Sequence, residues 1–272
     1  MAIKFGPAGL GPVKTAFEFL EEYHKLGLEA CEISFTYQIY IKPEDAKRIG
    51  KKAKELGISL SVHAPYFINL NSEEKAKREA SKKRILDCCR IGELLGAKVV
   101  VAHPGYYGNK APKSSVSKPS DYGENKEGAY ENIKKGVLEI LEEIKRQGWK
   151  INLALETMGK VNVFGSVEEI SHLVKETGCS FCIDFAHVLA RDKKIDYEKI
   201  GRLFPQKEWH AHFSGIIYGD KGERSHRKTE PQEWRDFLKN LPRDKNITII
   251  NESPDMINDS LDGRLIWKSL AN

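Results

Sequence analysis

The sequence predicts an α/β protein, a TIM (β/α)8 barrel with a metal site at the C-terminal ends of its strands. Eight short apolar segments alternate with eight amphipathic helical segments, and 272 residues shared by eight units is about 34 residues per unit, a length typical of a βαβ repeat. Runs such as KVVVA and ITII are typical of strands buried on both faces. No G-x-G-x-x-G follows the first strand, so a doubly wound open sheet ranks second.

Each expected strand is a short apolar run. The strands are expected at Ile3–Phe5, Ala30–Ile33, Ile58–Val62, Lys98–Ala102, Ile151–Leu155, Phe181–Ile183, Glu208–His212 and Ile247–Ile250. The helices are expected at Val13–Leu26, Glu44–Leu56, Glu73–Leu95, Glu131–Gln147, Val167–Glu176, Tyr197–Leu203, Pro231–Leu241 and Met256–Leu270. Ser72 and Ser166 stand directly before two of these helices, where a hydroxyl can cap the first N–H groups. No domain linker interrupts the alternation, so a single domain over residues 1–272 is expected.

One segment departs from this alternation. About two dozen residues rich in Gly, Ser, Pro and Lys separate His103 from the helix near Glu131. A loop of this length within a compact domain is usually functional or disordered. Its tyrosines and lysines would suit a nucleic-acid backbone with its sugars and bases, with a merely solvated insertion as the alternative. The residues expected to contact DNA here are Tyr106, Lys110 and Lys113, with Tyr107 and Lys118 nearby.

Composition narrows the class of protein. No apolar run approaches the roughly 18–20 residues that a membrane helix needs. The first residues, MAIKFGPAGLG, lack the features of a signal peptide, so a cytoplasmic protein without a membrane partner is expected. Five cysteines, an odd number, fit a reducing compartment, and the C-x-x-C pair Cys179 and Cys182 is expected to serve packing, with redox or zinc use as the alternative. The net charge of +5 mildly favours a polyanionic partner.

Candidate metal ligands follow the ends of six successive strands. They are His63, His103, Glu156, Asp184 with His187 three residues later, His212 and Glu252. In a barrel these strand ends converge on one face, and bound cations would offset the cost of burying the carboxylates there. Nitrogen and carboxylate ligands indicate Zn²⁺, with Mn²⁺ or Fe²⁺ as alternatives. The ligands exceed what one tetrahedral ion uses, which predicts a cluster with Glu156 as a bridge. His210 faces the same way as His212 and is expected to support or pack against it.

The stretch SVHAPYFINL, Ser61 to Leu70, combines a candidate ligand with two aromatic residues. Pro65 ends strand pairing because proline has no N–H to donate. Tyr66 and Phe67 follow directly and would suit a flat ring or base. The alternative is that His63 is a core histidine and the aromatic residues cap the core.

The segments VHAPYFINL, AHPG, LALET, CIDFAHVLA, HFSG and NESPD, taken in order, resemble the endonuclease IV family of apurinic/apyrimidinic endonucleases. The resemblance covers nearly the whole chain. It implies a TIM barrel with three zinc ions that hydrolyses the phosphodiester 5′ to an abasic nucleotide in base-excision repair. The products would be a 3′-hydroxyl and a 5′-deoxyribose phosphate. The implied partner is double-stranded DNA containing abasic sites, bound by a monomer that is nucleoid-associated in a prokaryote.

The same resemblance implies a role for each ligand. The first ion would be held by His63, His103 and Glu156, the second by Glu156, Asp184, His212 and Glu252, and the third by His187 and His226. Glu156 would be the catalytic residue that orients the attacking hydroxide, in keeping with multi-metal phosphoester hydrolysis. Tyr66 and Phe67 match the residues that wedge into the duplex when the abasic nucleotide is turned out.

Two segments depart from the family pattern. The family's third-metal motif is Asp-x-His, whereas GERSHRKTE places Arg224 two residues before His226. Glu223 is the expected substitute ligand, with Asp220 and Glu230 as alternatives. The loop after the second strand, SFTYQIY, lacks the arginine that some members insert into DNA, so Gln38 and Tyr37 are expected to serve there.

Two other functions fit parts of this pattern. A xylose-isomerase-like sugar isomerase or epimerase would hold one divalent ion with Glu156, Asp184, His212 and Glu252. That set does not account for four further histidines, namely His63, His103, His187 and His226. A non-catalytic nucleic-acid-binding protein with structural metals is the other possibility, but structural zinc sites are usually closed sets of four ligands, often with cysteine.

Overall fold

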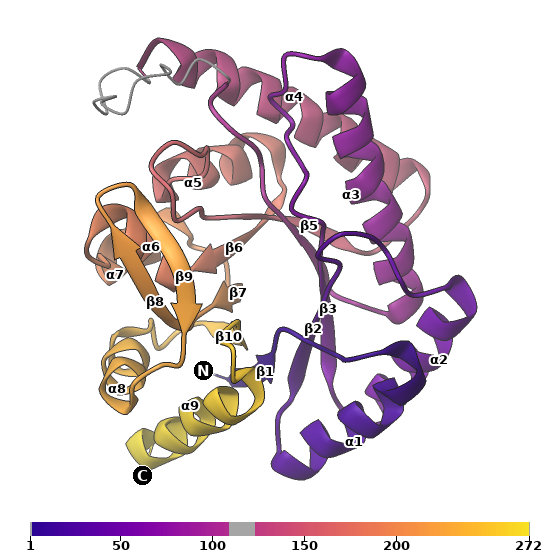
Figure 1. Ribbon diagram of the computed structural model, residues 1–272, viewed down its shortest axis with the longest axis vertical. Coiled ribbons are helices and arrows are strands. Elements are labelled where there is room, and N and C mark those ends of the chain that lie inside the picture. The colour runs from indigo at the N-terminus through magenta and orange to yellow at the C-terminus, as the bar shows by residue number, and fades with distance from the viewer. Residues whose placement is uncertain (1, 109–122, 272) are drawn as a thin grey trace.

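Eight short apolar strands form one parallel sheet that curves into a TIM barrel. The computed structural model describes residues 2–108 and 123–271. The barrel strands are β1 (Ile3–Pro7), β2 (Ala30–Ser34), β3 (Ser59–His63), β4 (Val99–Ala102), β5 (Asn152–Glu156), β6 (Ser180–Asp184), β7 (Glu208–His212) and β10 (Asn246–Asn251). Their order in the sheet is β1-β10-β7-β6-β5-β4-β3-β2 (Figure 1). Both the predicted fold class and all eight predicted strands are confirmed.

The first and second strands bring the two edges of the sheet together. Glu29 N donates a hydrogen bond to Phe5 O at 3.0 Å. Between them, Gly6 permits a very close approach, because a Cβ atom at this position would lie 1.9 Å from Ala30 O. A side chain there would push the strands apart, so the closure of the barrel depends on this glycine.

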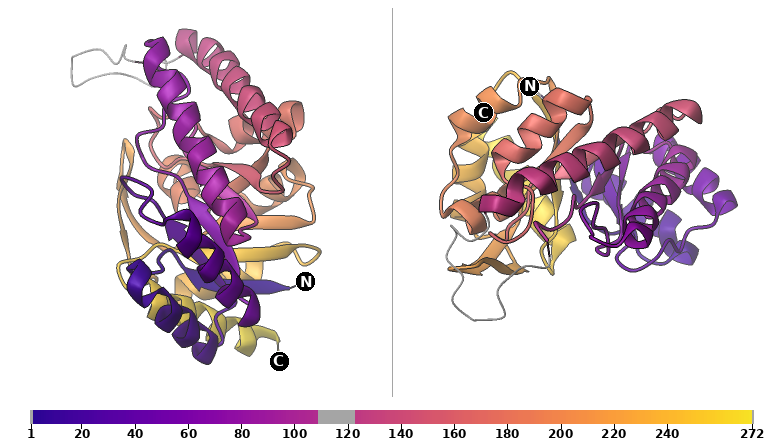
Figure 2. Two further views of the ribbon diagram at one scale, coloured as in Figure 1. Left: turned by 90° about the vertical axis from the view of Figure 1, so that its right-hand side faces the viewer. Right: turned by 90° about the horizontal axis from the view of Figure 1, so that it is seen from above.

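Helices surround the barrel on its outside (Figures 1 and 2). They are η1 (Val13–Thr15), α1 (Ala16–Leu26), α2 (Pro43–Glu55), α3 (Lys75–Leu95), α4 (Gly123–Arg146), α5 (Val167–Thr177), α6 (Phe185–Asp192), α7 (Tyr197–Leu203), α8 (Pro231–Asn240) and α9 (Met256–Ala271). Helix α6 was not predicted. Its N-cap is the candidate ligand Asp184, whose Oδ1 accepts a hydrogen bond from His187 N at 2.7 Å. None of the helices within the described ranges is long and apolar enough to cross a membrane.

The predicted helix starts are partly wrong. Helix α4 begins at Gly123 rather than near Glu131, so the connection after β4 is shorter than predicted. Helix α3 begins at Lys75 with Glu74 as its N-cap, and Ser72 does not cap it. Ser166, by contrast, forms the predicted cap as part of a capping box with Glu169. Of the loop residues expected to contact DNA, Lys110, Lys113 and Lys118 lie outside the described residues.

A two-stranded antiparallel hairpin follows β7 and was also not predicted. It consists of β8 (Gly215–Gly219) and β9 (Gly222–Arg227), and it lies beside α6 (Figure 1). Glu223 N donates to Gly159 O at 3.1 Å, which joins the hairpin to the segment after β5. Gly222 allows this contact, because its φ is +95° and a Cβ atom there would lie 2.1 Å from Gly159 O. The hairpin is thereby held over the C-terminal ends of the barrel strands.

Candidate metal centre

The strand ends bring the predicted ligands together in overlapping groups. Within each group, the candidate ligand atoms lie within 4.8 Å of one another. The groups are His63, His103 and Glu156; Glu156, Asp184, His212 and Glu252; and Asp184, His187 and His226. All come from strand ends except two: His187, on α6, and His226, on β9. The first two groups have the membership that the sequence predicted for two ions, and the role of these residues as ligands stays a prediction.

Glu156 lies at the centre of the cluster. Its Oε2 is 2.8 Å from His103 Nε2 and 3.2 Å from His63 Nε2. Its Oε1 is 3.2 Å from His212 Nδ1 and 3.5 Å from His187 Nδ1. The side chain is 1% exposed. A carboxylate with histidines on both oxygens has the arrangement that a ligand bridging two cations requires.

Backbone carbonyls orient two of the histidine rings. His63 Nδ1 is 2.8 Å from Ala64 O, and His187 Nδ1 is 3.0 Å from Thr157 O. A ring that donates one N–H to a carbonyl presents the lone pair of its other nitrogen. That nitrogen, Nε2, faces Glu156 in His63 and Glu223 in His187, the latter at 3.3 Å from Glu223 Oε2. Both rings are therefore held as metal-binding histidines usually are.

The carboxylates and histidines of the cluster shift one another's pKa values. Burial by itself would lower the pKa of His63. The hydrogen bond with Glu156 and the negative charge of Glu156 outweigh burial and raise this pKa to about 9. Burial raises the pKa of Asp184, whose Oδ2 is buried without a hydrogen-bond partner in the described part of the chain. The carboxylates thus attract protons onto neighbouring rings, and bound cations would take the place of these protons. This donor set fits divalent metal ions.

The hairpin contributes the remaining candidate ligands. His226 Nδ1 is 2.7 Å from Ser214 Oγ, and its Nε2 is 4.0 Å from Glu252 Oε2. Its ring centroid is 5.5 Å from that of His187. Glu223 Oε2 lies 3.3 Å from His187 Nε2, but the carboxylate that groups with His187 and His226 is Asp184, and the role of Glu223 as a ligand stays a prediction. The alternatives are elsewhere: Asp220 is in the hairpin turn and Glu230 is the N-cap of α8.

The aromatic residues at the rim of the cluster occupy two different positions. The Tyr66 ring lies 5.8 Å from His63 and 5.4 Å from His103 between centroids, beside the cluster. Phe67 instead pairs with Tyr37 at 5.9 Å, and these two side chains are 56% and 74% exposed. Gln38 and Tyr106 are also exposed. The structure therefore separates an inner aromatic residue from an outer aromatic pair.

Two residues of this region were missed by the sequence analysis. Lys160 lines the cavity of about 290 Å³ that opens over the cluster. Its position four residues after Glu156, in the segment that follows β5, was the available signal. Glu32 is fully buried inside the barrel, below the cluster, and it is the only charged residue of the strand sequence ACEIS. A charge within a buried strand was the signal for it.

Comparisons with known proteins give two kinds of relative. An uncharacterized protein of Methanocaldococcus jannaschii is 33% identical over 274 residues, covering 94% of each chain. A protein of Metamycoplasma arthritidis named probable endonuclease 4 is 25% identical over 262 residues, covering 90% of this chain and 81% of that protein. The resemblance to endonuclease IV found in the sequence motifs is confirmed by such relatives.

Solved structures share the fold at lower identity. Endonuclease IV from Thermus thermophilus superposes with a TM-score of 0.66 at 22% identity, covering 100% of this chain and 99% of that one. D-psicose 3-epimerase from Clostridium cellulolyticum superposes with a TM-score of 0.65 at 13% identity, covering 100% and 97%. These likenesses concern the fold alone. The profile of the xylose isomerase-like TIM barrel family matches residues 20–262, and the chain therefore belongs to that family.

Proposed function

We propose that the protein is a metal-dependent endonuclease that hydrolyses DNA 5′ to abasic sites, leaving a 3′-hydroxyl and a 5′-deoxyribose phosphate. The observation that carries this proposal is the surplus of histidines around one set of carboxylates. His63, His103, His187 and His226 converge on Glu156, Asp184 and Glu252, in addition to His212. One divalent ion needs only part of this set, whereas phosphodiester hydrolysis by several ions uses it all.

The proposed ligands fall into three sets. His63, His103 and Glu156 would hold one ion, and Glu156, Asp184, His212 and Glu252 a second. His187, His226 and Glu223 would hold a third. Zn²⁺, or alternatively Mn²⁺, would supply a water of lowered pKa and neutralise charge on the phosphate oxygens. Glu156 lies between the first two sets, and we assign it the positioning of the attacking water.

Residues around the rim of the metal centre would bind the DNA. Tyr66 and Phe67 would stack against bases next to the abasic nucleotide, and Gln38 and Tyr106 would contact the DNA strand around that nucleotide. Lys110, Lys113 and the newly identified Lys160 would contact phosphates. Turning out an abasic nucleotide costs less than turning out an intact one, because no base has to be unstacked. This difference in cost would give the enzyme its preference for the lesion.

The second candidate is a sugar isomerase or epimerase with one divalent ion. Glu156, Asp184, His212 and Glu252 form a group suited to that ion, and the fold is shared with D-psicose 3-epimerase. This function does not explain why four further histidines face the same carboxylates. It therefore ranks second.

The test compares two duplexes that differ at one position. Metal-loaded protein is incubated with a duplex carrying one tetrahydrofuran abasic analogue and with the matched intact duplex. We expect incision 5′ to the analogue only, with a 3′ end that a polymerase extends, and about three ions per chain by elemental analysis. No incision by metal-loaded protein would contradict the proposal. About one ion per chain with ketose epimerisation would instead support the second candidate.

A further inference from the structure

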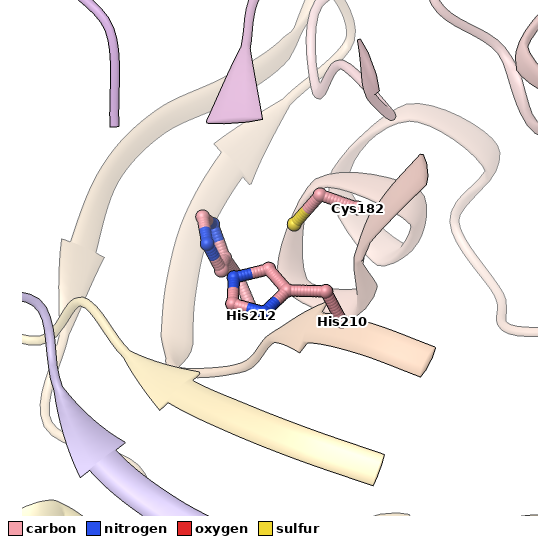
Figure 3. Close-up of side chains that lie close together, drawn as sticks. All are labelled: Cys182, His210 and His212. Atoms are coloured by element: carbon pink, nitrogen blue, oxygen red, sulfur yellow. The ribbon is translucent and has the colours of Figure 1, made fainter. Parts of the chain in front are cut away.

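A second layer of polar side chains lies inside the barrel, directly beneath the metal centre. Successive residues of a strand face opposite ways, so the residue two positions before each strand-end ligand also points into the barrel. Cys182 and His210 are such residues, preceding Asp184 and His212, and they are paired in the sheet register. Figure 3 shows the sulfur of Cys182 pointing towards the rings of His210 and His212. All three are buried.

Glu32 from β2 completes this layer with a negative charge. Its Oε2 accepts hydrogen bonds from Ser61 Oγ at 2.7 Å and from His210 Nε2 at 2.8 Å. Its Oε1 lies 2.9 Å from His212 Nε2, an ion-pair distance, although neither atom makes a hydrogen bond within the described part of the chain. Each carboxylate oxygen therefore faces a histidine nitrogen.

His212 stands between this layer and the metal centre. Its Nδ1 faces upward, 3.2 Å from Glu156 Oε1 and 3.5 Å from Glu252 Oε2. Its Nε2 faces Glu32. A neutral imidazole carries one proton, and a carboxylate beside Nε2 favours the tautomer with the proton there. The lone pair is then on Nδ1, the nitrogen that faces the proposed ligands.

We propose that Glu32 is a positioning residue that holds His212 in its metal-binding tautomer, and that His210 and Ser61 hold Glu32. The proposal rests on the proposed metal binding at His212. Partners of metal-bound histidines typically contribute about 10- to 100-fold in metal affinity. Glu32 reaches His212 from the opposite side of the barrel, so it also joins strands that are not neighbours in the sheet.

The layer is better explained as a support than as a further metal site. Cys182, His210 and His212 are close enough to hold an ion together. However, His210 Nε2 and His212 Nε2 already lie 2.8 and 2.9 Å from the oxygens of Glu32. An ion bound through these two nitrogens would displace both contacts and leave the Glu32 carboxylate without them.

The decisive variant is Glu32→Gln, which keeps the size of the side chain. If its amide N–H₂ faces His212 Nε2, it places a donor where the carboxylate stood, and the ring proton is then favoured on Nδ1. Zinc affinity is measured by competition with a chromophoric chelator, without DNA. We expect one ion per chain to bind about 10- to 100-fold more weakly, with the others unchanged. Ser61→Ala is the matched comparison, because it removes one bond that holds Glu32 but keeps the carboxylate beside His212 Nε2. We expect a smaller loss of affinity than in Glu32→Gln.

Several outcomes would overturn the proposal. These are unchanged affinities in Glu32→Gln, an equal loss in Ser61→Ala, or an ion that is lost only in Cys182→Ser. Thermal unfolding shows whether each variant is folded. If Glu32→Gln does not fold, long-range ¹H–¹⁵N spectra of the zinc-loaded unaltered protein decide: we expect a proton on His212 Nε2, and an unprotonated Nε2 contradicts the proposal. Because none of these measurements uses DNA, failure of the proposed nuclease function would not be confused with failure of this inference.

Discussion

The two sides of the metal centre are built in different ways. On one side, His63, His103 and Glu156 come from the ends of neighbouring barrel strands, which the parallel register of the sheet places side by side. On the other side, Glu223 and His226 come from the β8–β9 hairpin, which is not part of the barrel. The hairpin is positioned by individual contacts such as Glu223 N to Gly159 O and His226 to Ser214.

This difference indicates how the two sides should respond to change. The candidate ligands at the strand ends are held by the cooperative hydrogen bonding of the whole barrel, so removing one side chain should leave the positions of the others intact. The candidate ligands on the hairpin depend on a local approach that Gly222 permits, at φ +95°. We therefore expect the hairpin ion to be separable from the other two.

The largest effect is expected at the centre of the strand-end side. Glu156→Gln removes the charge shared by the first two proposed ions, so both should bind more weakly. Incision of an abasic duplex should fall by about 10³-fold or more, measured under single-turnover conditions. If activity and metal content stay close to those of the unaltered protein, Glu156 does not have the proposed central role.

An intermediate effect is expected on the hairpin side. His226→Ala should lower metal content by about one ion per chain and incision by roughly 10- to 100-fold, while the strand-end ions are retained. Elemental analysis after dialysis measures the first effect. Ser225→Ala is the control, because this neighbour on β9 is exposed and points the other way. Loss of all ions in His226→Ala would show that the two sides are not separable.

The smallest effect concerns the exposed aromatic residues of the two sides. Phe67→Ala should raise the Kd for an abasic duplex by about tenfold, the loss of one stacking contact, with little change in single-turnover rate at saturation. Tyr218→Ala is the matched change on the hairpin, where the ring packs on Lys193 instead. Fluorescence anisotropy compares the two. Equal losses of affinity in both variants would show that the hairpin side binds DNA as well.

The same contrast explains which features the sequence analysis found. Several barrel strands were predicted from β-branched runs such as KVVVA and ITII, because strands buried on both faces have a simple apolar pattern. Once the fold was a parallel barrel, the ligands after those strands had to meet at one face. Helix α6 and the hairpin were missed. Helix α6 has only eight residues and directly follows the candidate ligand Asp184, its N-cap, and β9 has the polar sequence GERSHR instead of an apolar run.

Sequence alone thus determined the barrel and the convergence of His63, His103, Glu156 and their neighbours, since both follow from local periodicity and one repeated topology. Only the tertiary structure decided the place of Glu223 beside His187 and the contacts of Glu32 with His210 and His212. The partners of Glu32 are 29 residues away, at Ser61, and 178 residues away, at His210. A buried charge is costly unless such partners pair with it. No local sequence pattern predicts contacts between residues so far apart in the chain.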